Sequence, residues 1–155
     1  MRTPINMKVK RILPPVYFLI SIVTMALLNL LAPISYFAQY PWNLLGIIPL
    51  VMGVALNLIA DAAFKKAQTT VKPFEISTAL ITTGVFRISR NPMYSGMVLI
   101  LIGIAILMGA LSPLIIIVFF AALIEFVFVR VEEKMLAKQF GLAWTDYQSK
   151  VRKWI

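Results

Sequence analysis

The chain has 155 residues, 61% of them hydrophobic, and a formal net charge of +9. This apolar fraction is above that of a soluble globular domain and indicates an integral membrane protein, in which positive charge reports topology, so we expect no nucleic-acid partner. The absence of cysteine excludes disulfides and thiolate metal sites, and the absence of histidine removes the usual general base and metal ligand, so no metal site is expected.

The N-terminal half of the chain predicts two membrane spans. Residues 14–37 supply the roughly 20 apolar residues that are needed to cross the hydrocarbon of a bilayer. After a short uncharged link, residues 42–64 form the second predicted span. Gly46, Gly53 and Ala55 would permit close approach of another helix, and Asn57 is interpreted as an interhelical hydrogen-bond partner.

Residues 65–91 form the one long polar segment between apolar regions. They hold five Lys and Arg residues against a single acid, Glu75. A connection of this length is usually functional or disordered, and Asn91 followed by Pro92 favours a turn. The basic side chains, a tyrosine hydroxyl and glycines at a membrane boundary suggest a site for an anionic, nucleotide-like molecule. The alternative is a positively charged interfacial loop that leads into a helix.

A helical hairpin is predicted next, because residues 93–130 are too long for one span and are interrupted near residues 109–113. Its arms are residues 93–108 and 113–130. A charged amphipathic helix comes after the hairpin, and Gly141 is expected to end it as a C-terminal cap.

The distribution of charge predicts the topology. All 15 Lys and Arg residues fall in the N-terminus, in residues 65–91, or from Arg130 onward. Four spans with both termini in the cytoplasm place every one of them inside. The predicted fold class is therefore an all-α integral membrane protein with four transmembrane helices and a cytoplasmic C-terminal helix.

The hairpin also predicts a site, because its two cytoplasmic ends must lie close together. Arg87, Arg90 and Tyr94 at one end should then face Glu132 and Glu133 at the other. The alternative is that the two glutamates pair with neighbouring cations on a solvated helix face, as helical side chains three or four residues apart commonly do.

Glu125 lies inside the last apolar run, about two helical turns before Glu132. Intramembrane carboxylates are costly and are functional by default. Three explanations stay open: Glu125 lines a substrate tunnel, it shares a proton with Asp61, or it pairs with a lysine from the polar loop.

Two motifs in a fixed order cover more than half of the chain, from about Thr69 to Ile155. They are T-x-G-x-F-R-x-S-R-N-P-M-Y-x-G and, after the hairpin, R-x-E-E-x-x-L-x-x-x-F-G-x-x-W-x-x-Y-x-x-x-V-R-x-W. This pattern resembles the isoprenylcysteine carboxyl methyltransferase family, most closely its short prokaryotic members. That family is in turn similar to the phospholipid N-methyltransferases.

The resemblance implies a single-domain integral membrane methyltransferase of the prokaryotic cytoplasmic membrane, with its active site facing the cytosol. S-adenosylmethionine is the expected methyl donor and S-adenosylhomocysteine the product. A lipophilic or lipidated acceptor would enter from the bilayer. Two segments, residues 69–96 and 130–155, would carry the cofactor site. The predicted cofactor-binding residues are Thr78, Ala79, Leu80, Ile81, Phe86, Arg87, Asn91, Pro92, Met93, Tyr94 and Glu132.

Arg90, Glu133 and Arg130 are the predicted catalytic residues. Arg130 is the nearest candidate for a substrate-facing arginine of the eukaryotic members, whose position holds Phe128 here, and Asn91 stands where the family has histidine. A carboxylate acceptor needs no general base, which suits a chain without histidine, so carboxyl O-methylation is expected. An amine acceptor would have to lose a proton, for which Glu133 or Glu125 would be the nearby base.

Other functions stay open from the sequence. Methylation of a phospholipid amine is the nearest alternative within the same class of enzyme. An NADPH-dependent sterol-type reductase resembles this family in its membrane fold. A small proton-coupled transporter would use Glu125 as its titrating carboxylate. The oligomeric state is not predicted.

Overall fold

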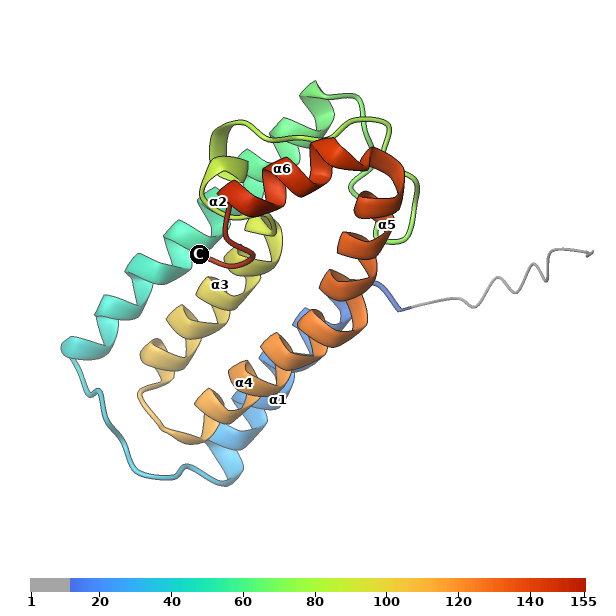
Figure 1. Cartoon of the computed structure of the whole chain (residues 1–155). Helices are drawn as coiled ribbons and strands as arrows, with labels where there is room; N and C mark the ends of the chain where they lie inside the picture. The colour runs from blue at the N-terminus through green and yellow to red at the C-terminus, as the bar shows by residue number, and fades with distance from the viewer. Residues whose placement is uncertain (1–11) are drawn as a thin grey trace, which may run out of the picture.

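The computed structural model describes residues 12–155, and every regular element in that range is helical (Figure 1). The N-terminal cations that enter the charge count lie outside the described residues. The elements are α1 (Pro14–Leu31), η1 (Trp42–Gly46), α2 (Ile47–Lys66), η2 (Gly84–Arg87), α3 (Pro92–Met108), α4 (Ser112–Ile124), η3 (Glu125–Val129), α5 (Arg130–Phe140) and α6 (Leu142–Lys150).

Three helices in the described residues are long and apolar enough to cross a membrane. They run over Pro14–Leu31, Trp42–Lys66 and Ser112–Phe140, whereas the apolar helix Pro92–Met108 is shorter, at 17 residues. The all-α membrane fold is thus confirmed. The fourth span at α3 and the cytoplasmic location of both termini stay predictions.

Glycines hold α2 against α3 at two levels. A Cβ atom added to Gly53 would lie 2.5 Å from the carbonyl oxygen of Gly96, and one added to Gly46 would lie 2.5 Å from that of Gly103. The predicted close helix approach is therefore confirmed for the two glycines, within one chain, whereas Ala55, which was named with them, is exposed. The interpretation of Asn57 needs correction, because its amide donates to the Gly53 carbonyl of its own helix, at 2.9 Å. A polar side chain without an acceptor across the interface satisfies itself this way.

The predicted hairpin turn between α3 and α4 is present, with Gly109 in the left-handed region at φ 73°. Only three residues separate the two helices. The helices nevertheless pack in other pairs, since α3 lies chiefly against α2 and α4 chiefly against α1 (Figure 1). The hairpin connects the two pairs and does not itself form the main contact.

The last predicted span and the charged helix predicted after it are parts of one helix. From Ser112 to Phe140 the chain is one continuous helix, in which η3 is a π-helical turn. α5 therefore extends α4 beyond the apolar run and carries Glu132 and Glu133 above it. Gly141 ends this helix at φ 53°, as predicted, and α6 then crosses over the ends of α2 and α3 (Figure 1).

Candidate active site

A cavity of about 290 Å³ lies at the end of the bundle where α5 and α6 turn over it. Its walls come from the start of α1, the end of α2, the connection between α2 and α3, the start of α3, and α5 with α6. It brings together ten of the residues predicted from the sequence: Ala79, Leu80, Ile81, Phe86, Arg90, Asn91, Pro92, Met93, Tyr94 and Glu132.

Four predicted residues do not line this cavity. Arg87 is exposed on η2, and Thr78 braces the connecting loop through a bond from its N–H to Thr69 Oγ1, at 2.9 Å. Arg130 points to Glu125, with its Nε 3.4 Å from the Oε1 of that residue, and its guanidinium lies over the ring of Phe126. Glu133 lies on the other side of α5 from the cavity wall, in contact with Arg90.

The start of α3 and the start of α5 meet at Tyr94 and Glu132. The Tyr94 hydroxyl donates to Glu132 Oε1 at 2.7 Å, and the Tyr94 side chain is buried. Within residues 12–155 no Lys or Arg nitrogen lies within 4 Å of the Glu132 carboxylate. The cavity wall therefore presents a carboxylate whose charge is not paired. This is the contact between the two hairpin ends that the sequence predicted.

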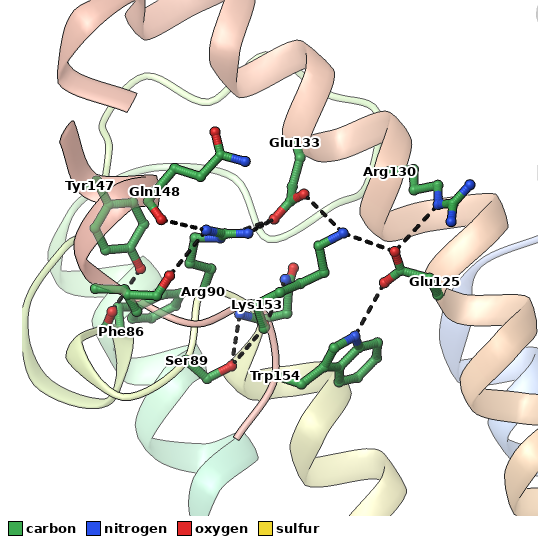
Figure 2. Close-up of polar contacts among 12 residues, drawn as sticks. Phe86, Ser89, Arg90, Glu125, Arg130, Glu133, Tyr147, Gln148, Lys153 and Trp154 are labelled. Atoms are coloured by element: carbon green, nitrogen blue, oxygen red, sulfur yellow. Dashed lines mark hydrogen bonds and ion pairs between the residues drawn. The ribbon is translucent and has the colours of Figure 1, made fainter. Parts of the chain in front are cut away.

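Arg90 makes a buried ion pair with Glu133. Its Nη2 lies 2.8 Å and its Nε 3.0 Å from Glu133 Oε1, and the two side chains are only 8% and 12% exposed. Its Nη1 donates to the carbonyl oxygens of Gln148, at 2.8 Å, and Val151, at 3.0 Å (Figure 2). The guanidinium thus links the turn before α3 to α5 and to the end of α6. Glu133 balances its charge before any ligand binds.

The C-terminal residues after α6 run beside the Ser89–Asn91 turn. The Arg90 N–H donates to the Arg152 carbonyl at 2.9 Å. The Ser89 hydroxyl and the Asn91 amide both donate to the Lys153 carbonyl, each at 3.1 Å. Asn91, which stands where the resembling family has histidine, is thereby fixed as a donor to the backbone at the cavity edge.

α6 contributes two aromatic side chains to which the sequence analysis gave no role. Trp144 and Tyr147 are buried and line the cavity. The Tyr147 hydroxyl donates to the Phe86 carbonyl at 2.7 Å, and burial raises the pKa of Tyr147 to about 12, although the nearby Arg90 charge acts in the opposite direction. The signal was available, since the quoted motif contains W-x-x-Y, a spacing that puts two rings on one helix face.

The loop before η2 supplies the rest of the wall. Phe74 lines the cavity with a φ of 66°, which is rare for a bulky residue, and its ring lies 5.5 Å from that of Phe128. Glu75 at the exposed rim accepts from Thr70 Oγ1 at 2.7 Å, which lowers the pKa of Glu75, and Lys72 adds to this effect. The length of this segment indicated that it is functional or disordered. The course of its backbone depends on the helices that it packs against.

Glu125 binds the C-terminal residues instead of either partner named from the sequence. Its Oε1 lies 2.9 Å from Lys153 Nζ, and its Oε2 accepts from Trp154 Nε1 at 3.2 Å (Figure 2). Asp61 instead pairs with Lys65, 2.6 Å away, so the alternative in which Glu125 shares a proton with Asp61 is wrong. The partner is a lysine, as one alternative held, but it comes from the C-terminal segment and not from the polar loop.

Comparison with known families gives one match over most of this structure. The family model described as phospholipid methyltransferase matches residues 42–143, from η1 into α6, and includes the Tyr94–Glu132 contact. Searches of curated proteins and of solved structures gave no match. The match covers well over half of the chain, and the resemblance seen in the sequence motifs is consistent with it. This chain belongs to the phospholipid methyltransferase family.

Proposed function

We propose that this protein uses S-adenosylmethionine to N-methylate the amine headgroup of a membrane lipid at the cytoplasmic face. The observation that carries the proposal is the charge of the cavity wall. Glu132 presents a carboxylate bonded to the neutral Tyr94 hydroxyl, while Arg90 is already paired with Glu133. Such a wall suits cationic groups. A carboxylate acceptor, which the sequence analysis favoured, would meet the unpaired Glu132 and would find Arg90 committed.

The residues of the cavity fit S-adenosylmethionine. Glu132 can hold an ammonium group, and the rings of Phe86, Trp144 and Tyr147 provide flat apolar surfaces for an adenine. At the rim, the Lys72–Glu75 pair is well exposed, with side chains 71% and 50% exposed, so it is weak and leaves Lys72 available for a carboxylate. When bound, this cofactor supplies a methyl group activated by its sulfonium.

The protein then has to align the acceptor and keep water out. Pro92, Met97 and Met135 give the cavity an apolar wall beside the Tyr94–Glu132 contact. An ammonium headgroup must lose a proton before its nitrogen can attack. Because Glu132 is assigned to the ammonium group of the cofactor, this proton would leave to water at the exposed rim beside Glu75, the other carboxylate among the described residues that line the cavity. Tyr94 holds Glu132 in place through its hydrogen bond.

Access from the bilayer is supported by the lining at the start of α1. Leu13, Pro14 and Pro15 border the cavity, and α1 is one of the helices long and apolar enough to span. A lipid whose chains lie along α1 would bring its headgroup to the cavity. We include in the proposal four spans, with α3 as the fourth, and both termini in the cytoplasm, because this arrangement puts all the counted cations on one side.

The two other classes of function fit the geometry less well. NADPH carries several phosphates, whereas the described residues line the cavity with two cations, of which Arg90 is committed to Glu133 and the exposed Lys72 could meet one anionic group. A proton-coupled transporter would need a carboxylate free to change its charge. Glu125 is instead held by Lys153 and Trp154.

The test is a pair of measurements on the detergent-purified protein. Calorimetric titration with S-adenosylhomocysteine should show saturable binding, and titration with NADPH should show none. Glu132→Gln keeps an acceptor for Tyr94 but removes the charge, so its affinity for S-adenosylhomocysteine should fall at least about tenfold. Asp146→Asn, the same change at an exposed carboxylate of α6, is the matched control and should bind as the wild type does.

Labelled methyl transfer then identifies the acceptor. Vesicles containing phosphatidylethanolamine should become labelled, whereas a prenylated cysteine with a free carboxylate should not. Labelling of the prenylcysteine alone would refute the amine acceptor while leaving the methyltransferase assignment intact. Binding of NADPH without S-adenosylhomocysteine would refute the methyltransferase itself.

A further inference from the structure

We propose that Glu125, Lys153 and Trp154 are positioning residues of the methyl-transfer site, and that they act by anchoring residues 151–155, here called the C-terminal strap. This inference rests on the proposed function, since the strap positions the cavity to which methyl transfer is assigned. None of the three residues lines that cavity. Their effect would reach it through the backbone of the strap.

The strap holds the cavity edge through main-chain groups. Carbonyl oxygens of Arg152 and Lys153 accept hydrogen bonds from the Arg90 N–H, the Ser89 hydroxyl and the Asn91 amide, at 2.9 to 3.1 Å. Ser89 and Arg152 also form an isolated parallel bridge. Arg90 and Asn91 line the cavity, and Tyr94 lies in the first turn of α3. A shift of the strap therefore moves three donors at the base of the site.

The strap is held in turn by side chains that converge on Glu125. Lys153 Nζ lies 2.9 Å from Glu125 Oε1 and 3.3 Å from Glu133 Oε2, and Trp154 Nε1 donates to Glu125 Oε2 at 3.2 Å (Figure 2). The Glu125 side chain is 18% exposed, so these charge-assisted bonds are shielded from water. Glu133 also binds Arg90. Side-chain contacts therefore run from Glu125 through Lys153 and Glu133 to Arg90 at the cavity edge.

The π turn explains why this chain of contacts exists. In an uninterrupted α-helix Glu125 would share a face with Glu132, seven residues later. A π turn accommodates about one extra residue and rotates the downstream part of the helix by roughly one position. η3 begins at Glu125, so Glu133 comes into line with Glu125 and both contact Lys153, while Glu132 is left to face the cavity. Glu125 and Glu133 are thus the anchoring carboxylates, whereas Glu132 belongs to the cavity.

The first measurement reads the anchor without any cofactor. Because the chain has no cysteine, Ile155→Cys creates a single thiol for a spin label on the exposed last residue of the strap. Glu125→Ala should increase the mobility of this label, as should Lys153→Met, whereas Lys153→Arg should leave it ordered. A label at Lys138→Cys on the exposed face of α5 should not respond, and Asp146→Ala is the matched carboxylate control. An unchanged label in both Glu125→Ala and Lys153→Met would overturn the anchor.

The second measurement tests positioning. With the strap loosened by Glu125→Ala, we expect affinity for S-adenosylhomocysteine and turnover each to fall about tenfold, the equivalent of about one charge-assisted hydrogen bond. Glu125→Gln keeps an oxygen acceptor for Trp154 and should fall between Glu125→Ala and the wild type. Trp154→Phe, which removes the N–H together with part of the indole ring, should do the same. Lys153→Arg should retain wild-type values, which a loss of packing alone would not predict.

The outcomes separate the two proposals. A mobile label with wild-type affinity and turnover would overturn the positioning role, since the strap would then be free without effect on the site. If Glu125→Ala does not fold, Lys153→Met supplies the same comparison with Glu125 intact. Absence of S-adenosylhomocysteine binding in the wild type would overturn the proposed function, and the positioning role with it, whatever the label shows.

Discussion

Arg90 shows how far a sequence determines the surroundings of a single side chain. Because the two hairpin ends must meet, Arg90 was expected near Glu132 and Glu133, and the ion pair with Glu133 is present. Its remaining donors bind the carbonyls of Gln148 and Val151, and no pattern of residue types predicts a main-chain acceptor 58 or 61 positions away. Proximity was therefore predictable, whereas the number of donors left for a ligand was not.

Tyr147 gives a prediction about pH at the same scale. Its hydroxyl bonds the Phe86 carbonyl, and burial raises its pKa from about 10 in an unfolded chain to about 12. The folded state therefore binds the proton more tightly, so the stabilisation is complete below about pH 10 and is lost as pH rises towards 12. Tyr147→Phe should remove this alkaline dependence and cost about 1–2 kcal/mol at neutral pH, because the Phe86 carbonyl loses its donor.

The measurement is thermal unfolding in detergent between pH 8 and about 12, taken as the difference between wild type and Tyr147→Phe so that titrating lysines cancel. Tyr36→Phe is the control, since that tyrosine is 53% exposed. A difference that stays constant across this range would contradict the assigned cause.

At the scale of elements, hydropathy located the apolar helices well and their ends less well. The prediction separated the last span from an amphipathic helix at residue 130, because charge begins there, but one helix runs through this point to Phe140. A helix can continue from apolar into charged residues when both have good helix propensity, as the charged residues of Arg130–Phe140 do. The π turn within it was not predictable either, since its residues carry no distinctive local pattern and its register is set by the tertiary contacts of each side chain.

The α2–α3 contact supports a second prediction. Gly53→Ala would bring a methyl group to 2.5 Å from the Gly96 carbonyl oxygen and 2.9 Å from the Ile100 backbone nitrogen. Backbone atoms cannot move away without shifting the helix, so the two helices must separate. The free energy of unfolding should fall by about 1–3 kcal/mol. The midpoint of thermal unfolding in detergent should fall accordingly. Ala55→Val, which adds methyl groups at an exposed position of the same helix, should change it little.

Gly96→Ala provides an internal check, because it adds its methyl group from the opposite side of the same contact. It should destabilise by a similar amount, and the double variant should cost more than either single change. Full stability of Gly53→Ala would show that α2 and α3 are not held at this distance.

For the whole molecule, the distribution of Lys and Arg predicts the membrane topology, which hydropathy alone does not. The apolar helix α3 is short, at 17 residues, yet it separates two segments that the placement of Lys and Arg assigns to opposite sides of the membrane. The prediction of four spans therefore depends on α3. The cavity, by contrast, needs the joint placement of five helices and a loop and was only partly foreseen, through the motif residues that line it.

Single cysteines in the cysteine-free chain test this topology. With a membrane-impermeant maleimide on intact cells, Ala38→Cys and Leu111→Cys should be labelled, because both lie in the short links that the prediction places outside. Ala67→Cys and Lys150→Cys should be labelled only after permeabilisation. Labelling of Ala67→Cys and Leu111→Cys from the same side would show that α3 does not cross the membrane.

The pairing of helices also orders the assembly of the protein during synthesis. α2 and α3 are consecutive helices and can pair as soon as both are made, through glycines that need no other helix. α1 packs chiefly against α4, so its main packing partner is made only after two further helices. The cavity, which takes its walls from α1 at one end of the chain and α6 at the other, is therefore completed late in biogenesis. The face of α1 that packs against α4 is therefore uncovered in the growing chain until α4 has been made.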